Sequence, residues 1–288
     1  MVDIRQTREY AKYLSKIGWE VERIAGINYF IKKFPLIGSV LKVQRPEEIK
    51  INKIYDLAKK YLAFQIIVEP KRELDAKFLT SVGYKLSKSP YLPTKTLFLD
   101  LGKSEKVLLA GFKKDSRAAI YSYEKVVKSE AKRVVNSGKN LESTIGPFRG
   151  AWKTSVGLKR YVPPLSHLLA LKESFKDNAL FITTTMKNAG AIFLKGDKVA
   201  YYWQAFTNKE GRRTLAQYKI VWEGIKWAKD RGAKVFDFEG IYDERFPNKS
   251  WLGFTHFKKS FGGYEVTYPG CFTKVILPFR LLPNPTKK

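Results

Sequence analysis

The sequence predicts an α/β protein of the α+β kind, with two mixed, mostly antiparallel sheets flanked by helices. Each half of the chain runs in the same order: helix, antiparallel strands, helix, strand. Turn pairs such as Ala25-Gly26 and Gly196-Asp197 separate the strand-like runs, and longer segments carry apolar residues at helical spacing. We therefore interpret the chain as two copies of one α/β unit, although the halves share little residue-level similarity.

The first half opens with a helical pattern and continues with strands. Residues 47–62 place their apolar side chains on one stripe, which predicts an amphipathic helix. Residues 63–68 are a continuous apolar run typical of a buried strand, and Pro70 closes it. Ser104 is suited to cap a further helix. The predicted elements are helix 6–17, strands 19–24, 27–34 and 39–44, helix 47–62, strand 63–68, helix 73–81, strand 96–101 and helix 104–113.

The second half repeats this order after Pro164. Its long amphipathic helix ends before Gly232, a residue typical of helix C-termini. Turn pairs at Lys187-Asn188 and Gly196-Asp197 divide the strands. The predicted elements are helix 164–176, strands 179–186, 190–195 and 198–206, helix 212–231, strand 235–238, helix 251–260 and strands within 264–276.

A strongly basic segment separates the two halves. Residues 131–160 hold seven Lys and Arg residues and a single acid, Glu142. A solvated linker and a cationic loop that faces an anionic substrate both fit this pattern. We therefore expect an N-terminal domain at 1–130, a basic connecting segment at 131–160 and a C-terminal domain at 161–288.

The composition predicts a folded, basic protein with an anionic partner. Apolar residues make up 44% of the 288 residues, enough for a sizeable core. The formal net charge of +27 attracts polyanions such as nucleic acid, nucleotide diphosphates or anionic lipid. Residues 1–13 lack an apolar signal core, and no run approaches about 18 unbroken apolar residues. We expect a cytoplasmic protein, and peripheral contact with the inner membrane face stays open.

Several kinds of chemistry are absent from the sequence. One cysteine, Cys271, excludes an intramolecular disulfide, and with two histidines it does not form a zinc motif, so we expect no metal. There is no GxxxxGK[ST] or GxGxxG motif. None of the 20 glycines is followed two positions later by Gly or Ala, as a loop that holds the coenzyme A pyrophosphate would require. We therefore expect no coenzyme A and no other cofactor.

One C-terminal block is distinctive. The run from Trp251 to Gly263 reads WLGFTHFKKSFGG, with Phe-Lys at 257–258 followed by Phe-Gly-Gly at 261–263. This block resembles the glycine-rich signature of Fem-type (FemA/FemB) peptidoglycan bridge-forming aminoacyltransferases. Residues 234–241, KVFDFEGI, and 96–101, TLFLDL, resemble further segments of that family. The resemblance covers most of the chain, and Phe-Lys with Phe-Gly-Gly is its most specific part.

The resemblance implies two tandem GNAT-like acyltransferase domains. It implies transfer of an amino acid from aminoacyl-tRNA to the stem peptide of a peptidoglycan precursor, carried on UDP or on lipid, to build an interpeptide bridge. Some members carry a long helical hairpin in the second domain, and this chain has no room for one. The positive charge would then do more of the work of holding tRNA.

Candidate site residues come from the resemblance and from residue type. The resemblance places Lys258 in the acyl-transfer channel, where an ammonium would stabilise an oxyanion, with Phe257 as the adjoining wall. Asp100 and Asp237 are candidate bases for the attacking amine. The guanidinium groups of Arg117 and Arg160 are suited to bind the phosphate oxygens of the acceptor. The full set of substrate-binding candidates is Arg117, Lys153, Arg160, Tyr161, Tyr202, Gly262 and Gly263. Each also has a plain structural interpretation: core packing, a tight turn or a solvated charge.

Two other functions remain open on the sequence alone. A transferase with the same tRNA donor could act on a protein or a small amine, because a fold does not fix the acceptor. A non-enzymatic, basic RNA-binding protein would explain the net charge equally well. That second alternative leaves the Phe-Lys and Phe-Gly-Gly spacing unexplained, and the sequence has no aromatic RNP strand or GXXG loop.

Overall fold

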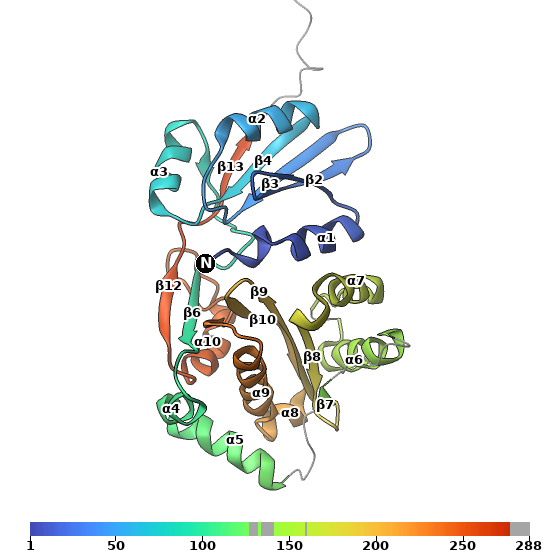
Figure 1. Ribbon diagram of the computed structural model, residues 1–288, viewed down its shortest axis with the longest axis vertical. Coiled ribbons are helices and arrows are strands. Elements are labelled where there is room, and N and C mark those ends of the chain that lie inside the picture. Colours follow the sequence, from blue (N-terminus) through green and yellow to red (C-terminus); the bar gives the residue numbers. More distant parts are fainter. Residues whose placement is uncertain (127–131, 134–140, 159, 277–288) are drawn as a thin grey trace, which may run out of the picture. The chain divides into compact units, whose positions relative to one another are not determined.

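The computed structural model describes residues 1–126, 132–133, 141–158 and 160–276 of the chain (Figure 1). These residues form two compact units, each with its own sheet and core. The first unit contains residues 1–4 and 95–266, and the second contains residues 5–94 and the segment that starts at Thr267. Both sheets are mixed and flanked by helices, as the sequence predicts.

The second unit is built on a six-stranded sheet in the order β1-β2-β3-β4-β13-β5. The pairs β1–β2, β2–β3, β4–β13 and β13–β5 are antiparallel, and β3–β4 is parallel. A parallel pair needs a crossover, which α2 provides. The elements are α1 (Arg8–Lys16), β1 (Glu20–Ile24), β2 (Ile27–Phe34), β3 (Gly38–Gln44), α2 (Ile51–Lys60), β4 (Ala63–Glu69), α3 (Glu73–Ser81), β5 (Lys85–Leu86) and β13 (Phe272–Val275), preceded by the short 3-10 helix η1 (Ile4–Gln6).

The two faces of this sheet are covered differently. Apolar side chains of β2, β3 and β4 pack with those of α2 and α3 into one buried cluster. On the other face, α1 packs through Tyr10, whose ring lies edge-on to that of Phe30 on β2, with centroids 5.7 Å apart. The Thr7 side chain accepts a hydrogen bond from the Tyr10 amide and so caps α1.

The first unit is built on a seven-stranded sheet in the order β12-β6-β11-β10-β9-β8-β7. The pair β10–β11 is parallel, and the pairs β6–β11, β9–β10, β8–β9 and β7–β8 are antiparallel. The elements are β6 (Lys95–Asp100), α4 (Glu105–Gly111), α5 (Lys114–Val126), β7 (Lys132–Arg133), α6 (Leu141–Val156), α7 (Leu165–Phe175), η2 (Lys176–Asn178), β8 (Ala179–Thr183), β9 (Ala189–Gly196), β10 (Val199–Thr207), α8 (Lys209–Arg213), α9 (Ala216–Asp230), β11 (Val235–Asp237), η3 (Lys249–Trp251), α10 (Leu252–Lys259) and β12 (Tyr264–Thr267).

Helices cover both faces of this sheet. The long helix α9 packs on β9 and β10 from one side, and α6 and α7 pack from the other (Figure 1). The main core joins buried residues of β6, β9, β10, β11 and α9 and extends to Phe261 beyond α10. The last turn of α10 lies next to the carboxyl end of β11, where Lys258 contacts the main chain of residues 239 and 240.

The division into units differs from the one that the sequence suggests. Residues 95–126 lie in the unit that contains β8 to β12, because β6 pairs with β11 rather than with the strands before it. The last two strands also separate, since β12 joins β6 and β13 joins β4 and β5. Strand pairing between segments far apart in the chain leaves no local signal, so sequence order alone suggests a simpler division.

The connecting segment contains more structure than a linker. Within residues 131–160, α6 buries Ile145, Phe148 and Trp152 against the sheet, although Pro147 lies inside the helix. Of the predicted basic segment 131–160, residues 131, 134–140 and 159 lie outside the described residues. In the described part of the chain, no helix combines the length and hydropathy needed to cross a bilayer.

Candidate functional site

The strands β10 and β11 separate where β11 ends, part of the way along β10. They pair in parallel from Val199 with Val235 to Tyr201 with Asp237, and the pairing ends there. Beyond this point β10 continues to Thr207 along β9 alone, with an irregularity between Tyr202 and Gln204. The chain after Asp237 stays with β6 instead, through main-chain hydrogen bonds of Phe238 and Ile241. The sheet therefore opens between the two strands just after Tyr201.

Lys258 lies on α10, and its ammonium reaches the turn that follows β11. Its Nζ donates to the main-chain carbonyls of Gly240, at 2.6 Å, and Glu239, at 3.0 Å. Only 7% of the residue is exposed. The described part of the chain provides these two acceptors, and an ammonium has three N–H donors. One N–H therefore remains for an incoming oxygen.

The turn that presents these carbonyls is held by Asp237. Its Oδ1 accepts hydrogen bonds from the Thr96 hydroxyl, at 2.5 Å, and from the Glu239 amide, at 2.8 Å. The Thr96 hydroxyl in turn accepts from the Gly240 amide at 3.1 Å. Glu239 and Gly240 both have positive φ, so the chain reverses sharply here. Asp237 and Thr96 thus fix the two carbonyl oxygens that bind Lys258.

The electrostatics of Lys258 are set by burial and by two carboxylates. Burial lowers the pKa of Lys258 to about 8, and the nearby charges of Glu239 and Asp237 partly oppose this shift. A buried ammonium is costly to desolvate, which explains the direction of the change. At neutral pH the group is still mainly protonated, and a modest rise in pH neutralises it.

Aromatic rings surround the ammonium. Nζ of Lys258 lies 5.8 Å from the centroid of the Tyr202 ring and 5.0 Å from that of Phe254. The Tyr202 hydroxyl accepts a hydrogen bond from Gln217 Nε2 of α9 at 2.7 Å. Burial raises the pKa of Tyr202, so the phenol stays neutral in the physiological range. These rings reduce the polarity around Lys258 and favour the cation through their π faces.

Arg160, in the segment between α6 and α7, contacts β10 beyond Tyr202. Its Nη2 donates to the Ala205 carbonyl at 2.8 Å and approaches Gln204 Oε1 at 3.5 Å. The guanidinium lies 5.8 Å from the Trp152 ring centroid and is close enough to Tyr202 for each to influence the pKa of the other. The structure thus places Arg160, Tyr202 and Lys258 along the same end of β10.

The structure does not bring Asp100 to this site. β6 runs antiparallel to β11, so Asp100 pairs with Val235 at the amino end of β11, whereas Asp237 lies at its carboxyl end. Asp100 is exposed, and its Oδ1 accepts from the Gly102 amide at 2.9 Å, an ordinary turn contact. Of the two candidate bases, only Asp237 lies near Lys258.

Three predicted phosphate-binding residues also lie elsewhere. Arg117 of α5 donates to the Ala110 carbonyl at 3.1 Å and to the Phe112 carbonyl, so it satisfies the end of α4. Lys153 on α6 and Tyr161 after it are exposed side chains. A substrate phosphate could recruit an exposed lysine, but the described contacts connect none of the three to Lys258.

Phe257, Gly262 and Gly263 have structural contacts that account for them. The Phe257 ring packs edge-on against Tyr218, with centroids 4.8 Å apart, and against Phe261. Gly262 and Gly263 have φ values of +72° and +95° in the turn from α10 to β12. A Cβ on Gly263 would lie 2.3 Å from the Phe98 carbonyl oxygen, so β12 can join β6 only with glycine there.

Sequence reasoning missed two contributions to the site. The carbonyls of Glu239 and Gly240 are main-chain atoms, so no residue type marks them. Gln217 lies on a helix remote in sequence from Tyr202, and only packing of α9 on β10 brings them together. Among the described residues, no group of three or more His, Cys, Asp or Glu side chains could hold a metal ion.

Comparisons with known proteins agree with this geometry. Residues 170–282 match the model of the FemAB family, a span that includes β10, β11 and α10. FemX shares the fold, with a TM-score of 0.76 and 15% identity over 95% of this chain and 92% of that one. L-PGS from Bacillus licheniformis gives 0.58 and 14%, over 91% and 85%. No curated protein sequence matches the chain.

A tandem GNAT protein from the clavulanic acid biosynthesis pathway is also similar in fold. Its TM-score is 0.51 at 10% identity, over 90% of this chain and 83% of that chain. Together these structures establish the tandem GNAT-like architecture, because each extends over both units. The resemblance to the Fem-type family that the sequence suggests is confirmed over residues 170–282, which match the FemAB family model, and the chain shares the fold of FemX.

Proposed function

We propose that the protein is an aminoacyltransferase that moves an amino acid from aminoacyl-tRNA to the stem peptide of a peptidoglycan precursor, building an interpeptide bridge. The observation that carries the proposal is the Lys258 ammonium, buried where β10 and β11 separate and held by the Glu239 and Gly240 carbonyls. The FemAB match over the same segment supports the reaction class.

Lys258 would stabilise the charge that develops during transfer. The acceptor amine attacks the ester carbonyl of the aminoacyl group, a C–N bond forms, and the carbonyl oxygen becomes an oxyanion. The C–O bond to the terminal ribose then breaks, and the released hydroxyl carries the proton that the amine loses. An ammonium fixed in a partly dry site stabilises the oxyanion without having to reorganise. The two carbonyls hold Nζ in place for this role.

A strong side-chain base is not required for this step. The aminoacyl ester is already activated, and alignment of the two substrates supplies much of the rate. Asp237 contributes by holding the turn from 237 to 240 and by keeping Lys258 protonated. In this mechanism it is a positioning residue, since its Oδ1 is occupied by the Thr96 hydroxyl and the Glu239 amide.

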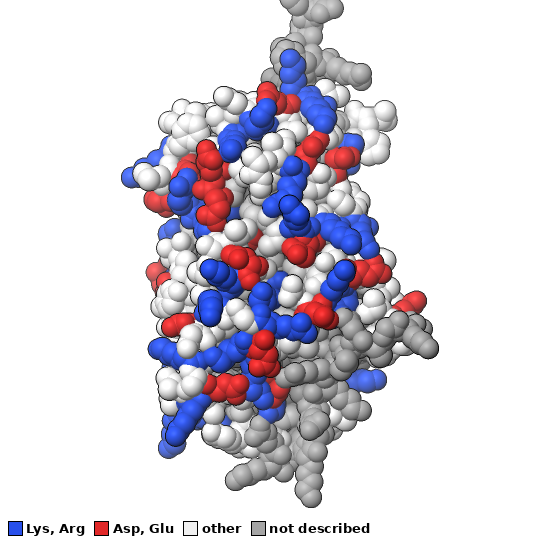
Figure 2. All heavy atoms as spheres, viewed as in Figure 1, with Lys and Arg blue, Asp and Glu red and all other residues white. Residues whose placement is uncertain are grey.

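The proposed donor is aminoacyl-tRNA rather than coenzyme A. The helix α8 that follows β10 begins at Lys209, and the Asn208 side chain caps it by accepting from the Gly211 amide at 2.9 Å. The net charge of +27 supports binding of a polyanion. On the face shown in Figure 2, Lys and Arg side chains are spread among Asp and Glu rather than gathered in one patch. An enzyme with this donor would act in the cytoplasm.

Arg160 is the proposed contact for the acceptor's diphosphate. Its guanidinium lies next to Tyr202 and beyond the point where β10 leaves β11. A guanidinium fork can bind two phosphate oxygens at once. The UDP-linked and lipid-linked muramyl-peptides both carry a diphosphate, so this contact suits either form.

The test is a transfer assay with radiolabelled aminoacyl-tRNA, pooled over all amino acids. UDP-muramyl-pentapeptide and the lipid-linked form are offered in parallel, with a protein N-terminus and small amines as alternative acceptors. We expect label on a muramyl-peptide with the wild-type chain. Transfer only to another acceptor would contradict the proposed acceptor, and salt-sensitive tRNA binding without any transfer would favour the RNA-binding alternative.

A further inference from the structure

An exposed apolar tip ends the β2–β3 hairpin of the second unit. We use "apolar tip" for Phe34, Leu36, Ile37 and Leu62. Leu36 is fully exposed, Ile37 is 64% exposed, Leu62 is 51% exposed and Phe34 is 41% exposed. The hairpin loop reads Phe-Pro-Leu-Ile-Gly and has no polar side chain. Isolated exposed leucines are common, but four adjoining apolar side chains in two turns form a surface that calls for a partner.

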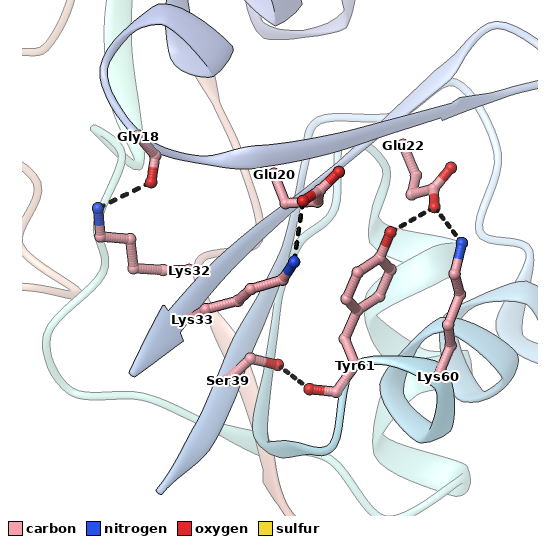
Figure 3. Close-up of polar contacts among 8 residues, drawn as sticks. All are labelled: Gly18, Glu20, Glu22, Lys32, Lys33, Ser39, Lys60 and Tyr61. Carbon is pink, nitrogen blue, oxygen red and sulfur yellow. Dashed lines mark hydrogen bonds and ion pairs between the residues drawn. The ribbon is translucent and has the colours of Figure 1, made fainter. Parts of the chain in front are cut away.

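The two turns that carry the tip are joined to each other. The Ser39 amide donates to the Leu62 carbonyl at 3.1 Å, and its hydroxyl donates to the Tyr61 carbonyl at 2.8 Å (Figure 3). A Cβ on Gly38 would lie 2.4 Å from the Leu62 carbonyl oxygen, so glycine allows this close approach. The loop between β2 and β3 and the turn before β4 are therefore joined to each other at the same end of the sheet.

Both leucines of the tip occupy an unfavourable backbone conformation. Leu36 has φ +65° and Leu62 has φ +49°, in the left-handed region where Gly, Asn or Asp is preferred. An exposed turn would be more stable with one of those residues. Leucine at both positions costs conformational energy and also exposes apolar surface. Such a local conflict is typical of a functional site.

Lysine residues border the tip. Lys32 and Lys33 precede the hairpin loop, and Lys59 and Lys60 precede Leu62. Lys33 pairs with Glu20 at 2.9 Å, and Lys60 pairs with Glu22 at 2.6 Å (Figure 3). The Lys33–Glu20 pair is exposed, so a phosphate group of a partner can replace its carboxylate at little cost. Lys60 is also exposed, whereas Glu22 is half-buried and accepts from the Tyr61 hydroxyl at 2.5 Å as well.

Aromatic rings lie among these lysines. Nζ of Lys33 and Nζ of Lys60 lie 5.3 and 4.9 Å from the Tyr61 ring centroid. Nζ of Lys32 donates to the Gly18 carbonyl at 3.0 Å and lies 5.7 Å from the Trp19 ring centroid. Apolar side chains at a tip, with Tyr, Trp and Lys behind them, match the order of groups from the acyl chains to the headgroups of a bilayer.

We propose that the apolar tip inserts into an anionic phospholipid bilayer, with the bordering lysines in the headgroup layer. The lysines outnumber the two glutamates, so the charge favours an anionic surface. Insertion of a few apolar side chains together with lysine contacts gives reversible, peripheral binding. If the proposed function holds, such binding also brings the enzyme to a lipid-linked acceptor. The insertion itself is argued from the apolar tip alone.

The test must separate insertion from simple attraction of a basic protein to anionic lipid. The double variant Leu36→Ser with Ile37→Ser keeps every charge and removes most of the exposed apolar surface. The matched control is Leu74→Ser, an exposed leucine on α3 of the same unit. Binding is measured by co-sedimentation with vesicles of phosphatidylglycerol and phosphatidylcholine. We expect the double variant to bind about tenfold more weakly or worse, from the lost apolar burial, and the control to bind as the wild type does.

Insertion depth gives a second measurement. Cys271 is fully buried, so a cysteine placed at Ile37→Cys can be labelled selectively with an environment-sensitive dye. We expect dye emission at position 37 to increase and shift to the blue on adding vesicles, and a dye at Leu74→Cys to stay unchanged. Failure of the wild type to bind vesicles, unchanged binding by the double variant, or a silent dye at position 37 would overturn the proposal.

Two further measurements separate this proposal from its alternatives. The double variant should bind tRNA as the wild type does, and an equal loss of tRNA binding would assign the tip to RNA instead. It should also transfer label to the soluble UDP-linked precursor at the wild-type rate, if that precursor is the acceptor. Vesicle insertion without any transferase activity would overturn the proposed function and leave the membrane proposal standing.

Discussion

Lys258 Nζ donates to the main-chain carbonyl of Gly240 at 2.6 Å, across the turn that ends β11. This bond connects the Phe-Lys segment on α10 with the Asp-Phe-Glu-Gly segment that begins at the last residue of β11. The two segments are separated in sequence, and the contact brings them together. It also locates the ammonium next to the opening between β10 and β11.

Lys258→Met should remove transfer and preserve the fold. The methionine side chain fills a similar volume, and it removes the ammonium that would stabilise the oxyanion. Loss of one such donor lowers kcat on the order of 10²–10³-fold. The rate is measured with the labelled aminoacyl-tRNA assay, and the fold by circular dichroism and thermal unfolding.

The matched control for this variant is Lys259→Met. Lys259 is the exposed neighbour on α10 and pairs with Glu265 at 2.5 Å. A surface charge of this kind contributes little to the site, so transfer should remain close to the wild-type rate. Equal losses in the two variants would contradict a specific role for Lys258.

Transfer should depend on pH through Lys258. Because the pKa of Lys258 is about 8, kcat/KM should fall as pH rises through that value and the ammonium loses its proton. In the unfolded chain a lysine titrates near 10.5. The contribution of Lys258 to the free energy of unfolding is therefore unfavourable below about pH 8, and this penalty is relieved as pH rises toward 10.5.

The measurement is kcat/KM for the wild type and Lys258→Arg across this range. Arginine keeps its charge throughout, so any activity of the variant should lack the alkaline decline. A wild-type rate that is constant from about pH 7 to about pH 10 would show that the charge on Lys258 is not needed.

Asp237→Asn should move the alkaline decline to lower pH. The Asp237 carboxylate raises the pKa of Lys258, and asparagine removes that charge while retaining an oxygen that can accept hydrogen bonds. Thr96→Val is the matched comparison, because it breaks the same hydrogen-bond group and leaves the carboxylate in place. It should reduce the free energy of unfolding by about 1–3 kcal/mol and leave the position of the decline unchanged. A shift of equal size in both variants would refute the electrostatic role.

Gly263→Ala and Gly253→Ala should change stability in opposite directions. At Gly263 the added Cβ would meet the Phe98 carbonyl oxygen at 2.3 Å, and φ is +95°, so we expect a loss of more than about 1 kcal/mol. Gly253 lies within α10, and a Cβ there meets nothing within 4 Å, so alanine should stabilise by about 0.5–1 kcal/mol. Urea unfolding of both variants measures these changes, and a stabilised Gly263→Ala would contradict the close approach of β12 to β6.

Most elements could be predicted from local sequence patterns. Strand 27–34 and helix 73–81 match β2 and α3 at both ends, and Ser104 caps α4 as predicted. Their periodicity and turn residues are local signals. The patterns missed α5 and α6, where Pro147 and two glycines obscure the helical periodicity of α6. Its stability comes instead from packing Phe148 and Trp152 against the sheet.

The candidate site was predicted only in part. Lys258 stands out by its motif, and the structure places Tyr202 and Arg160 near it. In the sequence, Asp100 ends one strand pattern and Asp237 lies within another, and either could serve as a base. The antiparallel pairing of β6 with β11 puts them at opposite ends of the strand pair, so only one lies near the ammonium.

The sequence by itself determined the α/β class, the basic surface and the family signature, because composition, periodicity and motif spacing are properties of the chain. The tertiary structure alone decided which strands share a sheet, which carboxylate reaches Lys258 and which carbonyls hold its ammonium. It also decided that Leu36 and Leu62 stand exposed at neighbouring turns. These relationships depend on contacts between residues distant in sequence, and such contacts leave no pattern in any local stretch of the chain.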